Sequence, residues 1–309
     1  MKQTDFGSVR LLLALENLAI RQALQNALQH EGFQRPIDVA SYDKLLAAVE
    51  AQPFDVIVTA TDLAGQFVPP FLGQLRRGAL IHHPLPVIVT LLTSVEAEYV
   101  TQVIDCGPDD MLQLPISSGQ LLSRLTQLAE NRKLFVVTSD YVGPDRRQTL
   151  RPGTAAAPQT EVPNPLQMRM MRLPEETFLF EMDACARKLK QMRLERFAFE
   201  LQWLLRAIRQ QFLPDQKDAE KLQTFCERIK TLLIHMPALL NAEDKAKLQP
   251  LSDKLMVGAN IVLKNGFSAD ATVLNGVAGL VNLLTQAMLA SLPAEILEAA
   301  GYPKVSAGK

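Results

Sequence analysis

Side chains able to do covalent, metal or acid–base chemistry are few in this 309-residue chain and stand apart from one another. The three cysteines, Cys106, Cys185 and Cys226, form no CxxC pair, and His82 and His83 are the only close pair among four histidines. Zinc sites and disulfide frameworks need closer spacing, so we expect no metal, no cofactor and no disulfide. Single cysteines fit a reducing cytoplasm. Since no nucleophile, base and orienting residue can be assembled, we do not expect an enzyme.

Charge is balanced over the whole chain but uneven along it. The 32 basic and 33 acidic residues leave a net charge of −1, which argues against a dedicated nucleic-acid binder. Residues 1–130 carry a net −6, residues 131–172 a net +4 and residues 173–309 a net +1. With 48% hydrophobic and 21% charged residues, the composition is that of a folded protein, and the length predicts about two domains.

The first 130 residues alternate short apolar runs with helical patterns. Strands are predicted at 10–15, 37–40, 54–60, 86–92 and 111–114, and helices at 18–30, 42–51, 68–77, 96–106 and 118–132. Apolar strands that alternate with helices form βαβ units and a parallel sheet covered on both faces. Five such units predict an α/β doubly wound domain of the flavodoxin-like type, with a five-stranded parallel sheet.

Residues 10–130 resemble the receiver domain of bacterial response regulators. The stretch VTQVIDCGPDDMLQLPIS at 100–117 is similar to the family's helix 4, Gly-Ala-x-x-Tyr, strand 5 and Lys-Pro segment. FDVIVTATDLAG at 54–65 is similar to its strand 3 and following loop, and LLLALENLAIRQAL at 11–24 to strand 1 and helix 1. The resemblance implies a two-component signalling domain, in which a working member transfers a phosphoryl group to an aspartate at the end of strand 3.

This chain departs from the receiver pattern at the phosphoryl acceptor and at the metal site. The resemblance places Ala60 at the acceptor aspartate, and it places Leu15 and Glu16 at the acidic pair that helps hold Mg²⁺. Alanine has no nucleophile, and one carboxylate is a poor set of ligands for Mg²⁺. Asp62 lies two residues beyond Ala60, but we interpret it as a solvated loop residue rather than a substitute acceptor.

The groups that would stabilise the transferred phosphoryl charge are also missing. The strand-4 Ser/Thr of the family maps to Leu91 or Leu92, with Thr93 one register away. The strand-5 lysine maps to Leu114, and the switch aromatic maps to Met111. Phosphoryl transfer depends on such a cation and hydroxyl. We therefore expect a degenerate pseudo-receiver at about 1–133 whose former pocket has become packed core.

Residues 134–172 are predicted to be a proline-rich linker, most flexible over about 148–172. It begins with the string SDYVGPDRR at 139–147, where Tyr141, Arg146 and Arg147 are candidate interaction residues. The RxxxR spacing after it resembles half of the PilZ cyclic-di-GMP motif, but the other half does not follow downstream. A solvated basic turn is favoured over nucleotide or anion binding.

Residues 173–309 are predicted to form an all-α helical bundle. Helices are expected at 174–212, as one or as a pair, and at 215–236, 241–263, 268–292 and 294–300. The stretch from 271 to 294 has no charged residue and is long enough to span a bilayer, but its asparagines and glutamine favour a buried helix. Because this helix is apolar on nearly all sides, we expect it in the bundle centre or in a homodimer interface.

Two side chains of the helical part could be mistaken for functional groups. His235 would suit a phosphotransfer domain, but Met236 and Pro237 follow it, so we expect a helix-end histidine with a structural role. Trp203 is expected in the core rather than as a ligand platform.

Two classes of function remain. We favour a non-enzymatic, cytoplasmic bacterial signalling or scaffold protein that binds protein partners, such as signalling, chemotaxis or regulatory proteins, without a membrane. The alternative is a transcriptional or RNA-binding, antiterminator-like regulator with the helical part as output. The mixed charges of 173–309 disfavour nucleic acid as a partner.

Overall fold

The computed structural model describes residues 5–78, 85–146, 159–213 and 215–290. The chain divides into two compact units, Met1–Leu189 and Lys190–Lys309, which are considered separately below.

The first unit is built on a five-stranded parallel sheet, as predicted. Its strands are β1 (Leu11–Ala14), β2 (Ile37–Val39), β3 (Val56–Ala60), β6 (Val87–Leu92) and β7 (Asp110–Gln113). Their order in the sheet is β2-β1-β3-β6-β7, which is the flavodoxin-like order 2-1-3-4-5. In the middle of the sheet Ile57 pairs with Leu12 on one side and Ile88 on the other, and all three are buried. Strands covered on both faces explain these continuous apolar runs.

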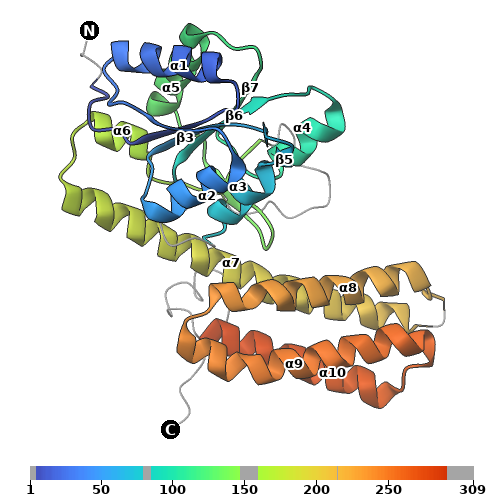
Figure 1. Ribbon diagram of the computed structural model, residues 1–309. Helices are drawn as coiled ribbons and strands as arrows, with labels where there is room; N and C mark the ends of the chain where they lie inside the picture. Colours follow the sequence, from blue (N-terminus) through green and yellow to red (C-terminus); the bar gives the residue numbers. More distant parts are fainter. Residues whose placement is uncertain (1–4, 79–84, 147–158, 214, 291–309) are drawn as a thin grey trace. The chain divides into compact units, whose positions relative to one another are not determined.

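Helices cover both faces of this sheet. They are α1 (Leu18–His30), α2 (Tyr42–Ala51), α3 (Pro69–Arg76), α4 (Ala97–Ile104) and α5 (Ser118–Glu130). Figure 1 shows α1 and α5 on one face, with α2 and α3 on the other. Asn17 starts α1 by accepting a hydrogen bond from the Ile20 amide, and Ser117 and Gln120 form a capping box at the start of α5. The predicted helices are confirmed, with ends that differ by a few residues.

The predicted linker must be corrected for its described residues, 134–146 and 159–172. They contain a second, antiparallel sheet of order β10-β8-β9 and a short helix, whose bounds are β8 (Phe135–Val137), β9 (Val142–Pro144), β10 (Gln159–Thr160) and α6 (Pro165–Met170). Pro144 is tolerated because β9 is an edge strand, and Pro165 occupies the first turn of α6. Leu166 belongs to the core of the first unit. The first unit therefore extends to Leu189 rather than ending at residue 133, and residues 147–158 lie outside the description.

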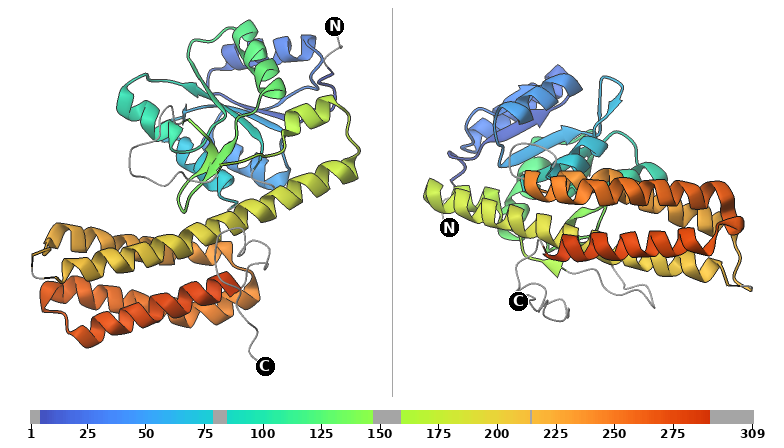
Figure 2. Two further views of the ribbon diagram at one scale, coloured as in Figure 1. Left: turned by 180° about the vertical axis from the view of Figure 1, so that it is seen from behind. Right: turned by 90° about the horizontal axis from the view of Figure 1, so that it is seen from below.

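The second unit is helical, as predicted. Its helices are the later part of α7 (Glu175–Gln211), then α8 (Ala219–His235), α9 (Ala242–Asn265) and α10 (Ala271–Ala290), with 3₁₀ turns at Met236–Leu239 and Gly266–Ser268. Figure 2 shows these four helices running side by side. The stretch 174–212 forms one continuous helix rather than a pair. The predicted helix 294–300 lies outside the described residues.

Helix α10 is less fully covered than its composition suggests. Among the described residues it is the one helix long and apolar enough to cross a membrane. In its most apolar stretch of 18 residues, 39% of the residues are buried. Val277, Val281, Leu284 and Met288 face the core of the second unit. Its exposed positions include Leu283 and a row of small or uncharged polar residues, Asn275, Gly276, Gly279, Asn282 and Gln286. The exposed face is therefore uncharged but mixed, with Leu283 among small and polar residues, and the helix is less apolar around its circumference than expected.

Of the two predictions about side chains in the helical part, the one for His235 is confirmed and the one for Trp203 is not. His235 is the last residue of α8 and precedes a 3₁₀ turn, as expected for a helix-end histidine. Trp203 is 52% exposed and meets the ring of Phe225 edge-on at 5.7 Å, so its expected place in the core is wrong. A large aromatic residue can fit the apolar spacing of a helix and still lie at the edge of the face that the helix buries.

Candidate functional site

The carboxyl ends of the parallel strands meet at one edge of the first sheet, where doubly wound folds place their ligand sites (Figure 1). Four of the five positions that the sequence assigns to a lost phosphorylation site are apolar there. Leu15, Ala60 and Leu91 are buried in the core of the first unit, and Leu114 packs against the same core. Ala60 pairs directly with Leu91 across β3 and β6. The structure thus brings these positions together as packed hydrocarbon.

Glu16, the fifth position, is exposed and engaged with the backbone. Its Oε2 accepts a hydrogen bond of 3.3 Å from the amide of Ala64. The loop that carries Glu16 is held by Arg21, whose Nη1 donates to the carbonyls of Leu15 at 2.5 Å and Glu16 at 3.1 Å. The Nε of Arg21 donates to Asp38 at 2.7 Å. A guanidinium, rather than a group of carboxylates around a cation, therefore organises the loop after β1.

Three hydroxyl groups, from Thr61, Thr93 and Tyr99, form a closed cluster at the same edge, and the sequence analysis missed it. The Tyr99 hydroxyl lies 2.6 Å from Thr61 Oγ1 and 2.8 Å from Thr93 Oγ1, and the two threonine oxygens are 3.3 Å apart. The Thr93 amide donates to Thr61 Oγ1, which also lies 3.2 Å from the Leu91 carbonyl. Each hydroxyl is satisfied by the others or by backbone, so the cluster holds the ends of β3 and β6 together.

Asp62 follows this cluster and caps a tight turn. It opens a small hairpin of β4 (Asp62–Leu63) and β5 (Gln66–Phe67) that the sequence analysis did not predict. Its Oδ1 accepts a 3.0 Å hydrogen bond from Gly65, and Ala64 and Gly65 both have positive φ, as tight hairpin turns require. Asp62 is half-buried in a strand and is therefore not the solvated loop residue that was expected, although its carboxylate has a local role in the turn.

This edge of the sheet lacks the groups for phosphoryl transfer at the expected positions. Mg²⁺ requires several oxygen ligands, and Glu16 and Asp62 each accept from a backbone amide of the same hairpin. Within the described ranges, no group of three or more His, Cys, Asp or Glu side chains could hold a metal ion. Leucine at position 114 supplies no cation for a transferred phosphoryl group. The hydroxyl groups at this edge already bond to one another and to the backbone, so what the edge offers to a partner is its exposed surface.

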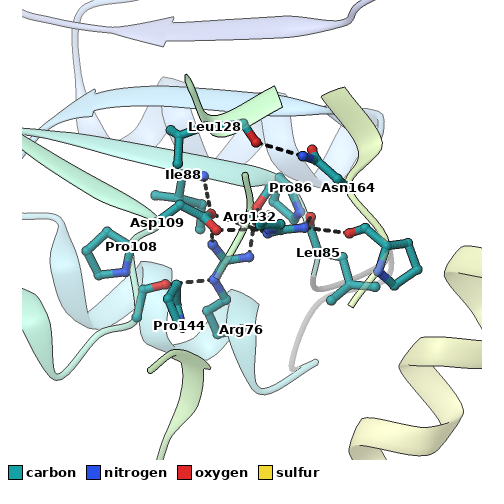
Figure 3. Close-up of polar contacts among 12 residues, drawn as sticks. Arg76, Leu85, Pro86, Ile88, Pro108, Asp109, Leu128, Arg132, Pro144 and Asn164 are labelled. Atoms are coloured by element: carbon teal, nitrogen blue, oxygen red, sulfur yellow. Dashed lines mark hydrogen bonds and ion pairs between the residues drawn. The ribbon is translucent and has the colours of Figure 1, made fainter. Parts of the chain in front are cut away.

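A buried electrostatic cluster lies at the other end of the sheet, around Asp109 just before β7 (Figure 3). One carboxylate oxygen of Asp109 accepts from Arg76 Nη2 at 2.5 Å and from the Ile88 amide at 2.8 Å. The other oxygen accepts from Arg132 Nε at 2.9 Å. The guanidinium carbons of Arg76 and Arg132 also lie over the Phe135 ring, 5.2 and 4.9 Å from its centroid. All these side chains are buried, so the cluster is structural.

Burial and ion pairing shift the pKa values of this cluster in opposing ways. Burial alone would raise the pKa of Asp109, but the charges of Arg132 and Arg76 outweigh it and hold that pKa below 3.8. Burial lowers the pKa of Arg76 to about 10, against the attraction of Asp109. Arg132 extends the cluster to the segment between β10 and α6 by donating to the Pro163 carbonyl at 2.7 Å. These contacts help to hold the described residues of the predicted linker within the first unit.

The YVGPDRR string is also used internally. The hydroxyl of Tyr141 donates to the Pro144 carbonyl at 2.8 Å, and burial raises the pKa of Tyr141 to about 12. Arg146 donates from Nη2 to the carbonyls of Pro108 at 2.8 Å and Asp109 at 3.1 Å. Tyr141 therefore closes the turn within the string, Arg146 fastens the string to the loop before β7, and Arg147 lies outside the described residues.

A second buried carboxylate, Asp55, ties α6 to the first sheet. It accepts from the Arg10 amide at 2.8 Å and from Arg169 Nε at 3.3 Å. The Arg169 guanidinium also stacks 3.7 Å from the Phe178 ring and pairs with Glu175. The sequence analysis treated Asp55 only as part of a strand, because its partner Arg169 is 114 residues away.

Comparisons with known proteins bear on the first unit alone. No protein-family model and no curated protein matches the chain. Among solved structures, the chemotaxis response regulator CheY4 of Vibrio cholerae is 21% identical, with a TM-score of 0.36, over 40% of this chain and 99% of that one. The orphan response regulator HP1043 of H. pylori is 18% identical, with a TM-score of 0.34, over 39% of this chain and 95% of that one.

The response regulator DrrB of Thermotoga maritima, an OmpR/PhoB homologue, is also similar, with 18% identity and a TM-score of 0.36. That match covers 41% of this chain and 56% of DrrB, so it spans about half of the DrrB chain. By its own strand order the first unit has the flavodoxin-like fold, and the solved structures similar to it are response-regulator receiver domains.

Proposed function

We propose that this chain is a non-enzymatic signalling or scaffold protein of the bacterial cytoplasm, with a pseudo-receiver that is not phosphorylated and acts by binding other proteins. The observation that carries the proposal is the buried pairing of Ala60 with Leu91 where a working receiver would hold its acceptor. The sequence resemblance of residues 10–130 to receivers supplies the signalling context.

The hydroxyl cluster of Thr61, Thr93 and Tyr99 supports the same proposal. A receiver switch needs an acceptor, a metal and a cation that respond together to a phosphoryl group. Here the hydroxyls bond to one another and to backbone, so their arrangement needs no ligand. The pseudo-receiver would therefore present one constant surface to its partners instead of switching between two.

Restoring the acceptor alone, by Ala60→Asp, is expected to leave the chain unphosphorylated by acetyl phosphate and Mg²⁺. Leu15 and Leu114 would still withhold a metal ligand and a cation, which phosphoryl transfer requires. Intact-protein mass spectrometry is the measurement, with Ala60→Asn as the matched variant of equal size and circular dichroism to show that both fold. A phosphorylated Ala60→Asp chain would mean that the rest of the site is still competent.

For the second unit we propose homodimerisation through the exposed, uncharged face of α10. Leu283 is 53% exposed at the centre of that face. Light scattering on the full chain at tens of micromolar should give a dimer mass, since two-fold dimers are the commonest assemblies. Leu283→Glu should reduce the mass to that of a monomer, whereas Ile234→Glu, at an exposed position on α8, should not. A monomeric wild-type chain would reject this interface.

A further inference from the structure

A polar cavity of about 410 Å³ lies beside the YVGPDRR string, apart from the strand ends discussed above. Its walls come from the start of β7, from α5, from residues 131–133 and from the end of β9 with Arg146 just beyond it. Three of its wall residues, Asp109, Leu128 and Pro144, are drawn in Figure 3. This volume is within the range of pockets that hold small molecules.

Positive charge is in excess around this cavity. Arg124, Lys133 and Arg146 all line it. The carboxylate of Asp109 is already matched by two buried guanidinium groups, and Asp110 pairs with Arg124 at 3.4 Å. Among the described residues, neither Lys133 nor Arg146 forms an ion pair with these carboxylates, so their charges remain for an anion from solution.

Arg146 is the cavity residue whose contacts bear most directly on anion binding. Its Nη2 is occupied by two backbone carbonyls, which do not neutralise the charge. Its Nε is shielded from solvent, so an anion in the cavity would pair with the guanidinium as a whole and not with this buried donor. Among the described residues no carboxylate pairs with Arg146, and such an anion would supply its counter-charge.

We propose that this cavity binds a small phosphorylated molecule, with the phosphate held by Arg146 and Lys133. The guanidinium group of Arg146 matches the geometry of phosphate oxygens. The ammonium group of Lys133 adds a second positive charge, which suits a phosphate group that carries two negative charges. Gln127 and Asn131 provide amide groups beside the cations for the rest of the ligand. Gln127 accepts from Arg124 through its carbonyl oxygen, which leaves its amide nitrogen as a donor.

Calorimetric titration of the full chain with AMP, at constant ionic strength, tests the proposal. We expect saturable binding that inorganic phosphate competes away, and none with adenosine, which lacks the phosphate. Lys133→Gln and Arg146→Gln should each raise the dissociation constant by roughly tenfold or more, the effect of losing one charge-assisted hydrogen bond. Lys44→Gln, on the exposed side of α2, removes the same charge elsewhere and should leave binding unchanged.

Arg146 also braces the loop before β7, so the Lys133 variant keeps the test independent of folding. Lys133 is exposed, and its substitution should preserve the circular dichroism spectrum and thermal midpoint. The proposal is overturned if AMP does not bind saturably, if adenosine binds as well, or if Lys44→Gln weakens binding as much as Lys133→Gln.

Discussion

Asp109→Asn is expected to destabilise the first unit by roughly 3–5 kcal/mol, the usual cost of removing one partner from a buried ion pair. The substitution preserves size but leaves the guanidinium groups of Arg76 and Arg132 buried without their shared carboxylate. It also weakens the hydrogen bond that the Ile88 amide donates to that carboxylate. Differential scanning calorimetry should show a lower melting temperature for the first unit.

Asp110→Asn is the matched control, because it makes the same change one residue later. Asp110 pairs at 3.4 Å with Arg124, whose side chain is half exposed, so roughly 0–1 kcal/mol is expected. Equal effects of the two substitutions would show that the buried cluster adds nothing special to stability.

The contribution of Asp109 should also depend on pH in a defined direction. Its folded-state pKa lies below 3.8, the ordinary value, so the carboxylate stabilises the folded state fully above that value. The stabilisation is lost as the pH falls through the folded-state pKa. The difference in stability between the wild type and Asp109→Asn should therefore be constant near neutral pH and should shrink in strong acid.

Gly107→Ala is expected to destabilise the first unit by roughly 2–4 kcal/mol, through backbone strain and a steric clash. Gly107 has a φ of +75°, and a Cβ there would lie 2.6 Å from the carbonyl oxygen of Val142. Gly143 faces it just as closely, since its own Cβ would lie 2.7 Å from the Gly107 Cα. The YVGPDRR string can approach the loop before β7 only because both positions are glycine.

Gly119→Ala in α5 is the control for this substitution. Nothing lies within 4 Å of a Cβ at Gly119, and alanine favours helix, so stability should change by no more than about 1 kcal/mol. Chemical denaturation monitored by circular dichroism compares the two variants. If Gly107→Ala were as stable as Gly119→Ala, the close packing of the string against the loop would be contradicted.

Local patterns in the sequence were sufficient to predict the main sheet and the long helices. The run at 54–60 is apolar on both faces because β3 is central, and the period of α1 matches the residues that it buries. The second sheet was missed because its strands are only two or three residues long and contain a proline. Short strands have little periodicity, and their pairing depends on contacts that are distant in sequence.

The degenerate phosphorylation site remains a prediction that comes only from the resemblance to receivers, which gives positions such as Ala60 and Leu114 a meaning. The hydroxyl cluster at the same edge of the sheet was not predictable in the same way. Thr61, Thr93 and Tyr99 are common residue types that come from separate segments, and only folding brings their hydroxyls together. Asp55 and Arg169 illustrate the same limit for charges, because 114 residues separate the partners.

The most direct measurement of the central claim is phosphorylation of the unmodified chain. The wild-type protein is incubated with acetyl phosphate and Mg²⁺ beside a working receiver, and both are analysed by intact-protein mass spectrometry under conditions that preserve acyl phosphates. We predict the unmodified mass for this chain, because Ala60, Leu15 and Leu114 supply no acceptor, metal ligand or cation. A stable phosphoprotein formed in a Mg²⁺-dependent way would contradict the pseudo-receiver account.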